Sequence, residues 1–244
     1  MNKYKITLEY DGTNYVGWQR QQNGQSIQSC LEDAIEKLVN ERVIVFGAGR
    51  TDAGVHAIAQ VAHFEIKKNI RIDKIRDGLN QHLRPNTIAI LKVEKVKENF
   101  HARFSANLRC YEYRIINRRP PLTLDQNRAW CIYKKLNIEK IMKEASSFKG
   151  KHDLESFRSI NCQSKTTIKT VKSISVEYNN DNLIFNICAK SFLHSQVRIM
   201  VGTLIDIGKD LLKQSVLDII KSKNRSNAGM TAPACGLYLK NIEY

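Results

Sequence analysis

The chain has 244 residues, of which 42% are hydrophobic and 26% charged, and its formal net charge is +15. This length suits one large domain or two of ordinary size, and no metal or disulfide is needed to support the core. The sequence has no apolar run near the roughly 18 residues that span a bilayer, which excludes a membrane-spanning protein. The positive charge favours a polyanionic partner, foremost nucleic acid, although part of it reflects a general abundance of Lys, Asn and Ile.

Residues 1–105 predict a β-α-β-β-α-β order. Residues 4–10 alternate apolar and polar side chains, which is typical of a strand with one buried face. After Ser26, a suitable N-cap, apolar residues recur at helical spacing. The remaining predicted elements of this half are strands at 43–46 and 58–66, a helix at 72–83 and a strand at 87–96.

Residues 106–244 predict the same order without repeating the sequence. The predicted elements are strands at 109–116, 169–178, 183–189 and 237–242, with helices at 138–148 and 194–207. Asn179 to Asn182 predict a hairpin turn, and Gly208 is expected as a helix C-cap. The fold class is therefore α+β, with two split β-α-β halves of RRM or ferredoxin-like type. We expect mainly antiparallel sheets, helices on one face of each, and an active-site cleft between the halves.

The segment from Gly47 to Ala57 is the predicted site of chemistry. It places Arg50 and Asp52 two residues apart in a loop with three glycines, directly after an apolar run. A dinucleotide fingerprint is excluded, because Asp52 stands where a glycine is needed and would repel a pyrophosphate. The following residues 58–66 also read as a strand. Taken alone, Thr51 to Gly54 is best interpreted as a turn with an Asx-type hydrogen bond.

The cysteines and histidines indicate no metal site. The six cysteines are scattered without a C-x-x-C pair, and the N-terminus has no apolar signal segment, so we expect a reduced, cytoplasmic protein. The histidines show no ligand spacing either. His56 and His63 lie beside the glycine loop, where they contact phosphate or, by default, solvate an exposed face.

Several further segments resemble signature blocks of one family, the TruA family of tRNA pseudouridine synthases. The resemblance covers nearly the full chain, and its most specific part is Arg50 to His56. The segments that carry it are residues 11–21, 49–57, 100–106, 111–113, 196–202 and 232–239.

The resemblance implies an isomerase that converts uridine to pseudouridine in the anticodon stem-loop of tRNA, at positions 38, 39 and 40. It also implies a homodimer with a basic cleft and no cofactor. The chemistry of the reaction agrees with this, because exchanging an N1 glycosidic bond for a C5 bond consumes neither electrons nor a metal.

Asp52 matches the essential aspartate of this family. A carboxylate is ionised at neutral pH without help, so it can act without a separate activating base. Three roles stay open: attack on the sugar C1′, elimination at C2′, or addition to the base. Arg50 is expected to clamp a phosphate and help extrude the nucleotide, with a surface arginine that supports the backbone as the alternative.

The second half supplies two more candidate residues. Tyr111 matches the family's active-site tyrosine, whose ring can stack on the extruded uracil for roughly 1 to 3 kcal/mol and whose hydroxyl can move the C5 proton. Tyr113, on the same strand face, is expected in the core. Arg198 flanks the apolar stripe of its helix, a half-buried position that calls for a carboxylate partner. The resemblance implies Asp52 as that partner, and a structural pair with another acid is the alternative.

Two departures from the family pattern affect details. Residues 83–88 differ from the usual Leu-Pro-x-Asp-Ile form, and Cys110 stands where a polar or basic residue is common. Two other functions stay open: a non-catalytic RNA-binding protein, which leaves Asp52 without a task, and the same isomerase acting on another RNA or other tRNA positions.

Overall fold

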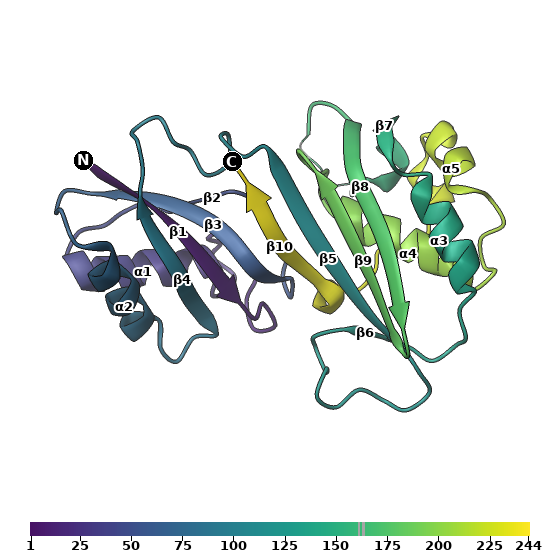
Figure 1. Cartoon of the computed structure of the whole chain (residues 1–244), viewed down its shortest axis with the longest axis horizontal. Helices are drawn as coiled ribbons and strands as arrows, with labels where there is room; N and C mark the ends of the chain where they lie inside the picture. Colours follow the sequence, from purple (N-terminus) through teal and green to yellow (C-terminus); the bar gives the residue numbers. More distant parts are fainter. Residues whose placement is uncertain (161, 163) are drawn as a thin grey trace. The chain divides into compact units, whose positions relative to one another are not determined.

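The computed structural model describes residues 1–160, 162 and 164–244 (Figure 1). These residues form two compact units, one of Met1–Asn107 with Tyr238–Tyr244 and one of Leu108–Leu237. Each unit combines a mostly antiparallel sheet with helices, which confirms the α+β class. The finer split β-α-β plan of each half stays a prediction. Over the described part of the chain, no helix is both long and apolar enough to cross a membrane.

The first unit has a sheet in the order β4-β1-β3-β10, with two helices behind it in Figure 1. Side chains alternate along β1 as predicted, and Tyr4, Ile6 and Leu8 are fully buried. The last strand, which sequence order places in the second half, pairs in parallel with β3 of this unit. The elements are β1 (Asn2–Tyr10), α1 (Ile27–Val39), β2 (Phe46–Gly47), β3 (His56–Ile66), α2 (Ile72–Leu83), β4 (Ile88–Lys95) and β10 (Leu237–Glu243).

Helix α1 begins where the sequence predicts. The Ser26 side chain accepts a hydrogen bond from the Ser29 backbone N–H at 3.1 Å, and the Ser29 side chain accepts one from the Ser26 N–H at 3.1 Å. These two bonds satisfy backbone donors that a helix start leaves open. The helix ends at Asn40, which adopts a left-handed conformation with φ of 58°.

The strand predicted at residues 43–46 is wrong for most of its length, because only Phe46 and Gly47 pair as β2. The Val45 N–H donates to the Glu32 carboxylate of α1 at 3.0 Å instead of to a strand. The Glu32 side chain therefore accepts the backbone N–H of Val45, which would donate to a neighbouring strand if residues 43–46 formed a strand. Beyond β2 the segment stays beside β3, since the Ala48 N–H donates to the Val61 carbonyl at 2.8 Å.

The second unit has a sheet in the order β5-β9-β8-β7, with the short β6 parallel to β5. The predicted hairpin joins β8 and β9 through Asn180, whose φ is 52°. The short strands β6 and β7 were not predicted. The strands are β5 (Leu108–Asn117), β6 (Trp130–Ile132), β7 (Gly150–Asp153), β8 (Ile168–Asn179) and β9 (Asn182–Ala189).

Helix α4 is the most buried helix of this unit, as its apolar stripe predicts. It starts at Gln196 rather than residue 194, and Gly208 is its last residue rather than its C-cap, a position that Lys209 takes. A side chain at Gly202 would bring a Cβ atom within 1.9 Å of the Met230 carbonyl oxygen, so this glycine lets the chain pack directly on the helix. The other helical segments are α3 (Ile138–Ser146), α5 (Val216–Ser222) and 3-10 turns at Glu155–Phe157, Arg225–Asn227 and Ala234–Gly236.

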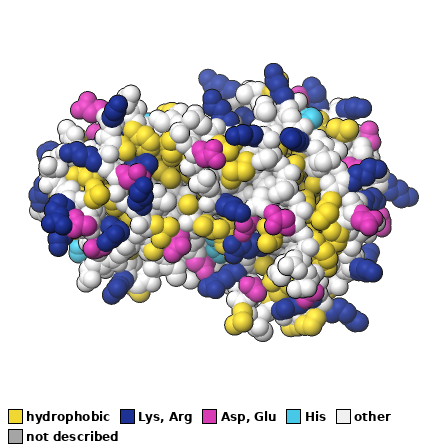
Figure 2. All heavy atoms as spheres, in the orientation of Figure 1, with side chains coloured by type: hydrophobic (Ala, Val, Ile, Leu, Met, Phe, Trp, Pro, Cys, Tyr) yellow, Lys and Arg dark blue, Asp and Glu magenta, His cyan; other side chains and the backbone are white. Residues whose placement is uncertain are grey.

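The basic side chains are spread over both units on the face shown in Figure 2, where Lys and Arg do not gather in one tail or patch. This agrees with their even spread along the sequence. A dispersed excess of +15 attracts a polyanion over long range without marking one site.

His63 was expected to contact phosphate or solvate an exposed face, and both expectations are wrong. Its side chain is 3% exposed, and its Nδ1 atom accepts a hydrogen bond from the Ala102 N–H at 3.1 Å. Burial, together with the nearby His101 and Lys3, lowers the pKa of His63 to about 4. His63 is therefore a neutral core residue of β3, covered by the segment that contains His101 and Ala102.

This burial predicts a loss of stability in mild acid. Because the pKa of His63 is lower in the folded state than in the unfolded chain, protonation favours unfolding as the pH falls below about 6.5 towards 4. The His63 contribution to the free energy of unfolding should fall by about 2 kcal/mol between pH 7 and pH 5. An NMR titration of the ring should give a midpoint near 4. A midpoint near 6.5 would contradict this account, and a His63→Gln variant should lose this part of the pH dependence.

Candidate active site

Asp52 begins a tight turn in which the Val55 N–H donates to the Asp52 carbonyl at 3.2 Å. Gly54, with φ of 76°, closes the turn. The Asp52 side chain is half-buried, while that of Arg50 is exposed. The segment does contain a turn, which spans Asp52 to Val55 rather than the predicted Thr51 to Gly54. It leaves the carboxylate and the guanidinium on residues that reach the surface.

The loop after β1 packs directly against this turn. The Trp18 N–H donates to the Thr51 carbonyl at 3.0 Å, and the hydroxyls of Tyr10 and Thr51 share a hydrogen bond of 2.8 Å. A Cβ atom at Gly17 would lie 2.6 Å from the Thr51 carbonyl oxygen and 3.1 Å from the Asp52 carbonyl carbon. The backbone on either side of Asp52 is thus fixed by contacts that leave no room for a side chain.

His56 braces the far side of the same turn. Its side chain is 2% exposed, so the expectation that it contacts phosphate or solvates a face is wrong. Its Nδ1 atom accepts the Gly12 N–H at 3.0 Å and lies 3.2 Å from a carboxylate oxygen of Asp11. The ring also stacks on Tyr238 with a centroid distance of 4.7 Å.

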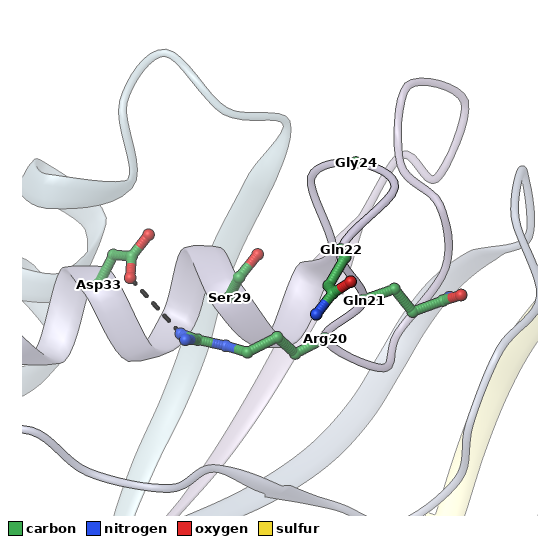
Figure 3. A pocket seen from close by; sticks show the side chains of 6 residues that line it. All are labelled: Arg20, Gln21, Gln22, Gly24, Ser29 and Asp33. Carbon is green, nitrogen blue, oxygen red and sulfur yellow. Dashed lines mark ion pairs between the residues drawn. The ribbon is translucent and has the colours of Figure 1, made fainter.

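A buried carboxylate anchors this loop on α1. Glu32, whose side chain is 10% exposed, lies 2.7 Å from a guanidinium nitrogen of Arg20, and Asp33 lies 3.6 Å from the same atom. Figure 3 shows Arg20 reaching along the helix towards Asp33, beside a shallow cavity of about 370 Å³. Glu32 also accepts the Val45 N–H. This one carboxylate therefore links two segments to α1: the loop after β1, through Arg20, and the segment that precedes the Asp52 turn, through Val45.

Tyr111 lies on β5 opposite Ile187, with its side chain 9% exposed and its ring edge-on to Phe192 at a centroid distance of 5.2 Å. Tyr113 is fully buried, which confirms the prediction that it belongs to the core. Its hydroxyl donates to the Pro233 carbonyl at 2.7 Å, and burial raises its pKa well above the ordinary value. Tyr111 therefore keeps a small exposed fraction that Tyr113 lacks.

Arg198 is half-buried in α4, as its position beside the apolar stripe predicts. Its Nε atom donates to the Ala232 carbonyl at 2.8 Å, and the Ala232 N–H donates to the Arg198 carbonyl at 3.1 Å. These two hydrogen bonds hold the Arg198 side chain against the segment that contains Ala232.

The amino-acid sequence shows the family of the chain. A family model described as tRNA pseudouridine synthase matches residues 6–105 and 145–244, which is most of the chain. The chain belongs to the tRNA pseudouridine synthase family. The resemblance predicted from the sequence is thereby confirmed, and with it membership in a family of isomerases that act on uridine in tRNA.

Relatives that match nearly the whole chain are named tRNA pseudouridine synthase A. The protein of Ehrlichia chaffeensis named tRNA pseudouridine synthase A is 51% identical over 244 residues, which cover 99% of this chain and 100% of the relative. One from Ehrlichia ruminantium is 49% identical, with 99% of both chains covered. One from Maricaulis maris is 45% identical over 247 residues, covering 100% of this chain and 98% of the relative.

A solved structure described as a Cbf5–Nop10–Gar1 complex aligns over 96% of this chain and 57% of the other. The identity is 11% and the TM-score 0.34, too low for an argument about fold. Family membership therefore rests on sequence.

The expectation of fully reduced cysteines is wrong for this synthase, because Cys110 and Cys188 form a disulfide. They are directly opposite each other on β5 and β9, with Cα atoms 4.2 Å apart. They lie 78 residues apart in the sequence, so no local spacing pattern reveals the pair. Cys110, one of the two departures from the family pattern, thus crosslinks the strand that carries Tyr111.

Proposed function

We propose that this synthase isomerises uridine to pseudouridine in the anticodon stem-loop of tRNA, at positions 38, 39 and 40, and that it acts as a homodimer. Asp52 is the essential carboxylate. The observation that supports this role is the rigid setting of the Asp52 turn, in which Gly17, Trp18 and Tyr10 fix the backbone while the acid stays half-buried. Catalytic groups need such fixed positions.

Three further residues are proposed to bind the substrate. Arg50, exposed beside Asp52, binds a phosphate of the RNA, since guanidinium groups match phosphate geometry. Tyr111 is nearly buried at 9% exposure, and its ring stacks on uracil after the base is extruded. Arg198, held by Ala232, supplies a second fixed positive charge.

The reaction needs a site that positions the detached uracil and limits hydrolysis. Cleavage of the N1 bond, rotation of the base and formation of the C5 bond need proton movement, and no electrons are exchanged. A carboxylate and a tyrosine hydroxyl are sufficient donors and acceptors for these steps. A non-catalytic RNA-binding role has less support, because the chain belongs to an enzyme family.

The test is to map pseudouridine in an unmodified tRNA transcript after incubation with the wild-type protein. We expect pseudouridine at positions 38, 39 and 40 where the transcript has uridine, and none in a transcript with cytidine there. Tyr111→Ala should lower kcat/KM at least ~10-fold through lost stacking, and Arg50→Ala should reduce the salt dependence of binding by about one charge. Pseudouridine at other positions only would contradict the proposed site, and none at all would contradict the activity.

A further inference from the structure

Four aromatic side chains of the first unit form a continuous series of ring contacts. Phe46 stacks on His63 with centroids 5.2 Å apart, and it also contacts His101 at 5.6 Å. His101 in turn contacts Phe104 at 4.4 Å. The guanidinium of Arg103 lies 5.7 Å from the centre of the Phe104 ring. We call the surface made by Phe46, His101, Arg103 and Phe104 the Phe104 platform.

In the platform, His101 is held by hydrogen bonds, while the two phenylalanine side chains are exposed to solvent. His101 Nδ1 accepts the backbone N–H of Arg103 at 3.1 Å, and the His101 N–H donates to the Ser105 hydroxyl at 3.0 Å. Phe104, in contrast, is 76% exposed and Phe46 is 44% exposed. Single exposed apolar residues are common on protein surfaces. A connected row of exposed rings with a cation beside it is a different feature, because it gathers several aromatic groups and a positive charge on one surface.

One member of the platform, Phe46, lies on the chain segment that leads to Asp52, and His101 joins Phe46 to Phe104 by ring contacts. Phe46 pairs with His63, and the segment continues beside β3, where the Gln60 side chain donates to the Gly49 carbonyl at 2.9 Å. Asp52 is six positions after Phe46, at most about 20 Å of extended chain. The exposed Arg50 stands between them. An RNA strand that places a nucleotide at Asp52 and a phosphate at Arg50 would reach the platform with its neighbouring nucleotides.

We infer that the Phe104 platform stacks an unpaired base of the same tRNA whose uridine is bound at Asp52, and that Arg103 contacts a phosphate next to that base. This inference rests on the proposed function. Unpaired bases stack on aromatic rings, and arginine adds phosphate contacts, which is the usual way proteins hold single-stranded RNA. The alternative occupant is a second copy of this chain. RNA is favoured by the charge of Arg103, by the net charge of +15 and by the position of Phe46 a few residues before Arg50 and Asp52.

The experiment measures tRNA binding by Phe104→Ala, Phe104→Trp and wild type at one fixed salt concentration. Loss of one stacked base should raise the Kd of Phe104→Ala about 5- to 150-fold, while Phe104→Trp, which keeps an aromatic surface, should bind nearly as tightly as wild type. Ile72→Ala is the matched control, since Ile72 is 48% exposed in the same unit but lies on α2, behind the sheet. Its Kd should equal that of wild type.

The outcomes separate this inference from the proposed function. If wild type makes pseudouridine and Phe104→Ala binds tRNA as well as Ile72→Ala does, the platform is wrong and the activity stands. If wild type makes none, the activity is wrong, and the binding comparison still reports on the platform. Sedimentation and thermal melting accompany each variant. Dissociation of a dimer by Phe104→Ala would assign the surface to a second copy and overturn the inference. Should Phe104→Ala melt early, Phe46→Ala gives the same comparison.

Discussion

Replacing Asp52 with alanine is expected to lower the single-turnover rate of pseudouridine formation by at least about 10⁴-fold, the scale on which enzymes lose rate when a nucleophilic group is removed. The Kd for tRNA should change far less, because most binding energy comes from phosphate and stacking contacts elsewhere. The backbone of the turn is held by the Trp18 N–H and by the close packing of Gly17, so the variant should fold.

Two further variants make the Asp52 result specific. Asp52→Asn keeps the size of the side chain and removes its charge, so it should be nearly as inactive as the alanine variant. Asp181→Ala removes an exposed acid from the turn between β8 and β9 and should keep the wild-type rate. Single-turnover assays with excess enzyme measure all three. An Asp52→Ala protein that modifies tRNA at an undiminished rate would exclude Asp52 as the essential group.

Regular side-chain patterns were enough to predict most of the fold. The alternation of Tyr4, Ile6 and Leu8 predicted β1, and the apolar stripe on residues 197–208 predicted α4. The strand expected at residues 43–46 was mostly wrong because the Glu32 side chain takes the Val45 N–H. Strands β6 and β7 are short, and a short segment shows no periodicity that separates it from a loop.

For the candidate site, the sequence could name residue types but could not show their setting. Asp52 is visible as an acid in a glycine-rich loop, and the family motif marks it. His56 was judged by its proximity in sequence to that loop, whereas its environment depends on Gly12 and Tyr238, which are distant in the chain. The contact of Gly17 with Thr51 is hidden in the same way. Such pairings are set by tertiary packing, which leaves no periodic signal in one sequence.

Gly17→Ala is expected to lower both stability and activity, although Gly17 takes no part in the chemistry. Gly17 has φ of 110°, which L side chains rarely adopt, and its Cβ would lie 2.6 Å from the Thr51 carbonyl oxygen. The strained φ costs about 1 kcal/mol or more, and the steric conflict adds about 1 to 3 kcal/mol. To relieve the conflict, the Thr51 carbonyl must move and weaken its bond to the Trp18 N–H. A shift of about 1 Å at the Asp52 backbone would lower the rate about 100-fold.

Gly150→Ala separates the two causes, because Gly150 has nearly the same φ of 112° while its Cβ would make an ordinary contact with the His152 ring at 3.5 Å. This variant should show the backbone cost of about 1 kcal/mol and keep the wild-type rate, since it lies on β7 of the second unit. Urea unfolding gives the stability of both variants, and single-turnover assays give their rates. If Gly17→Ala were no less active than Gly150→Ala, the packing of Gly17 on the Asp52 turn would not control the position of the carboxylate. A selective loss of rate in Gly17→Ala would show that the close backbone contact, rather than glycine flexibility, holds the turn in its working position.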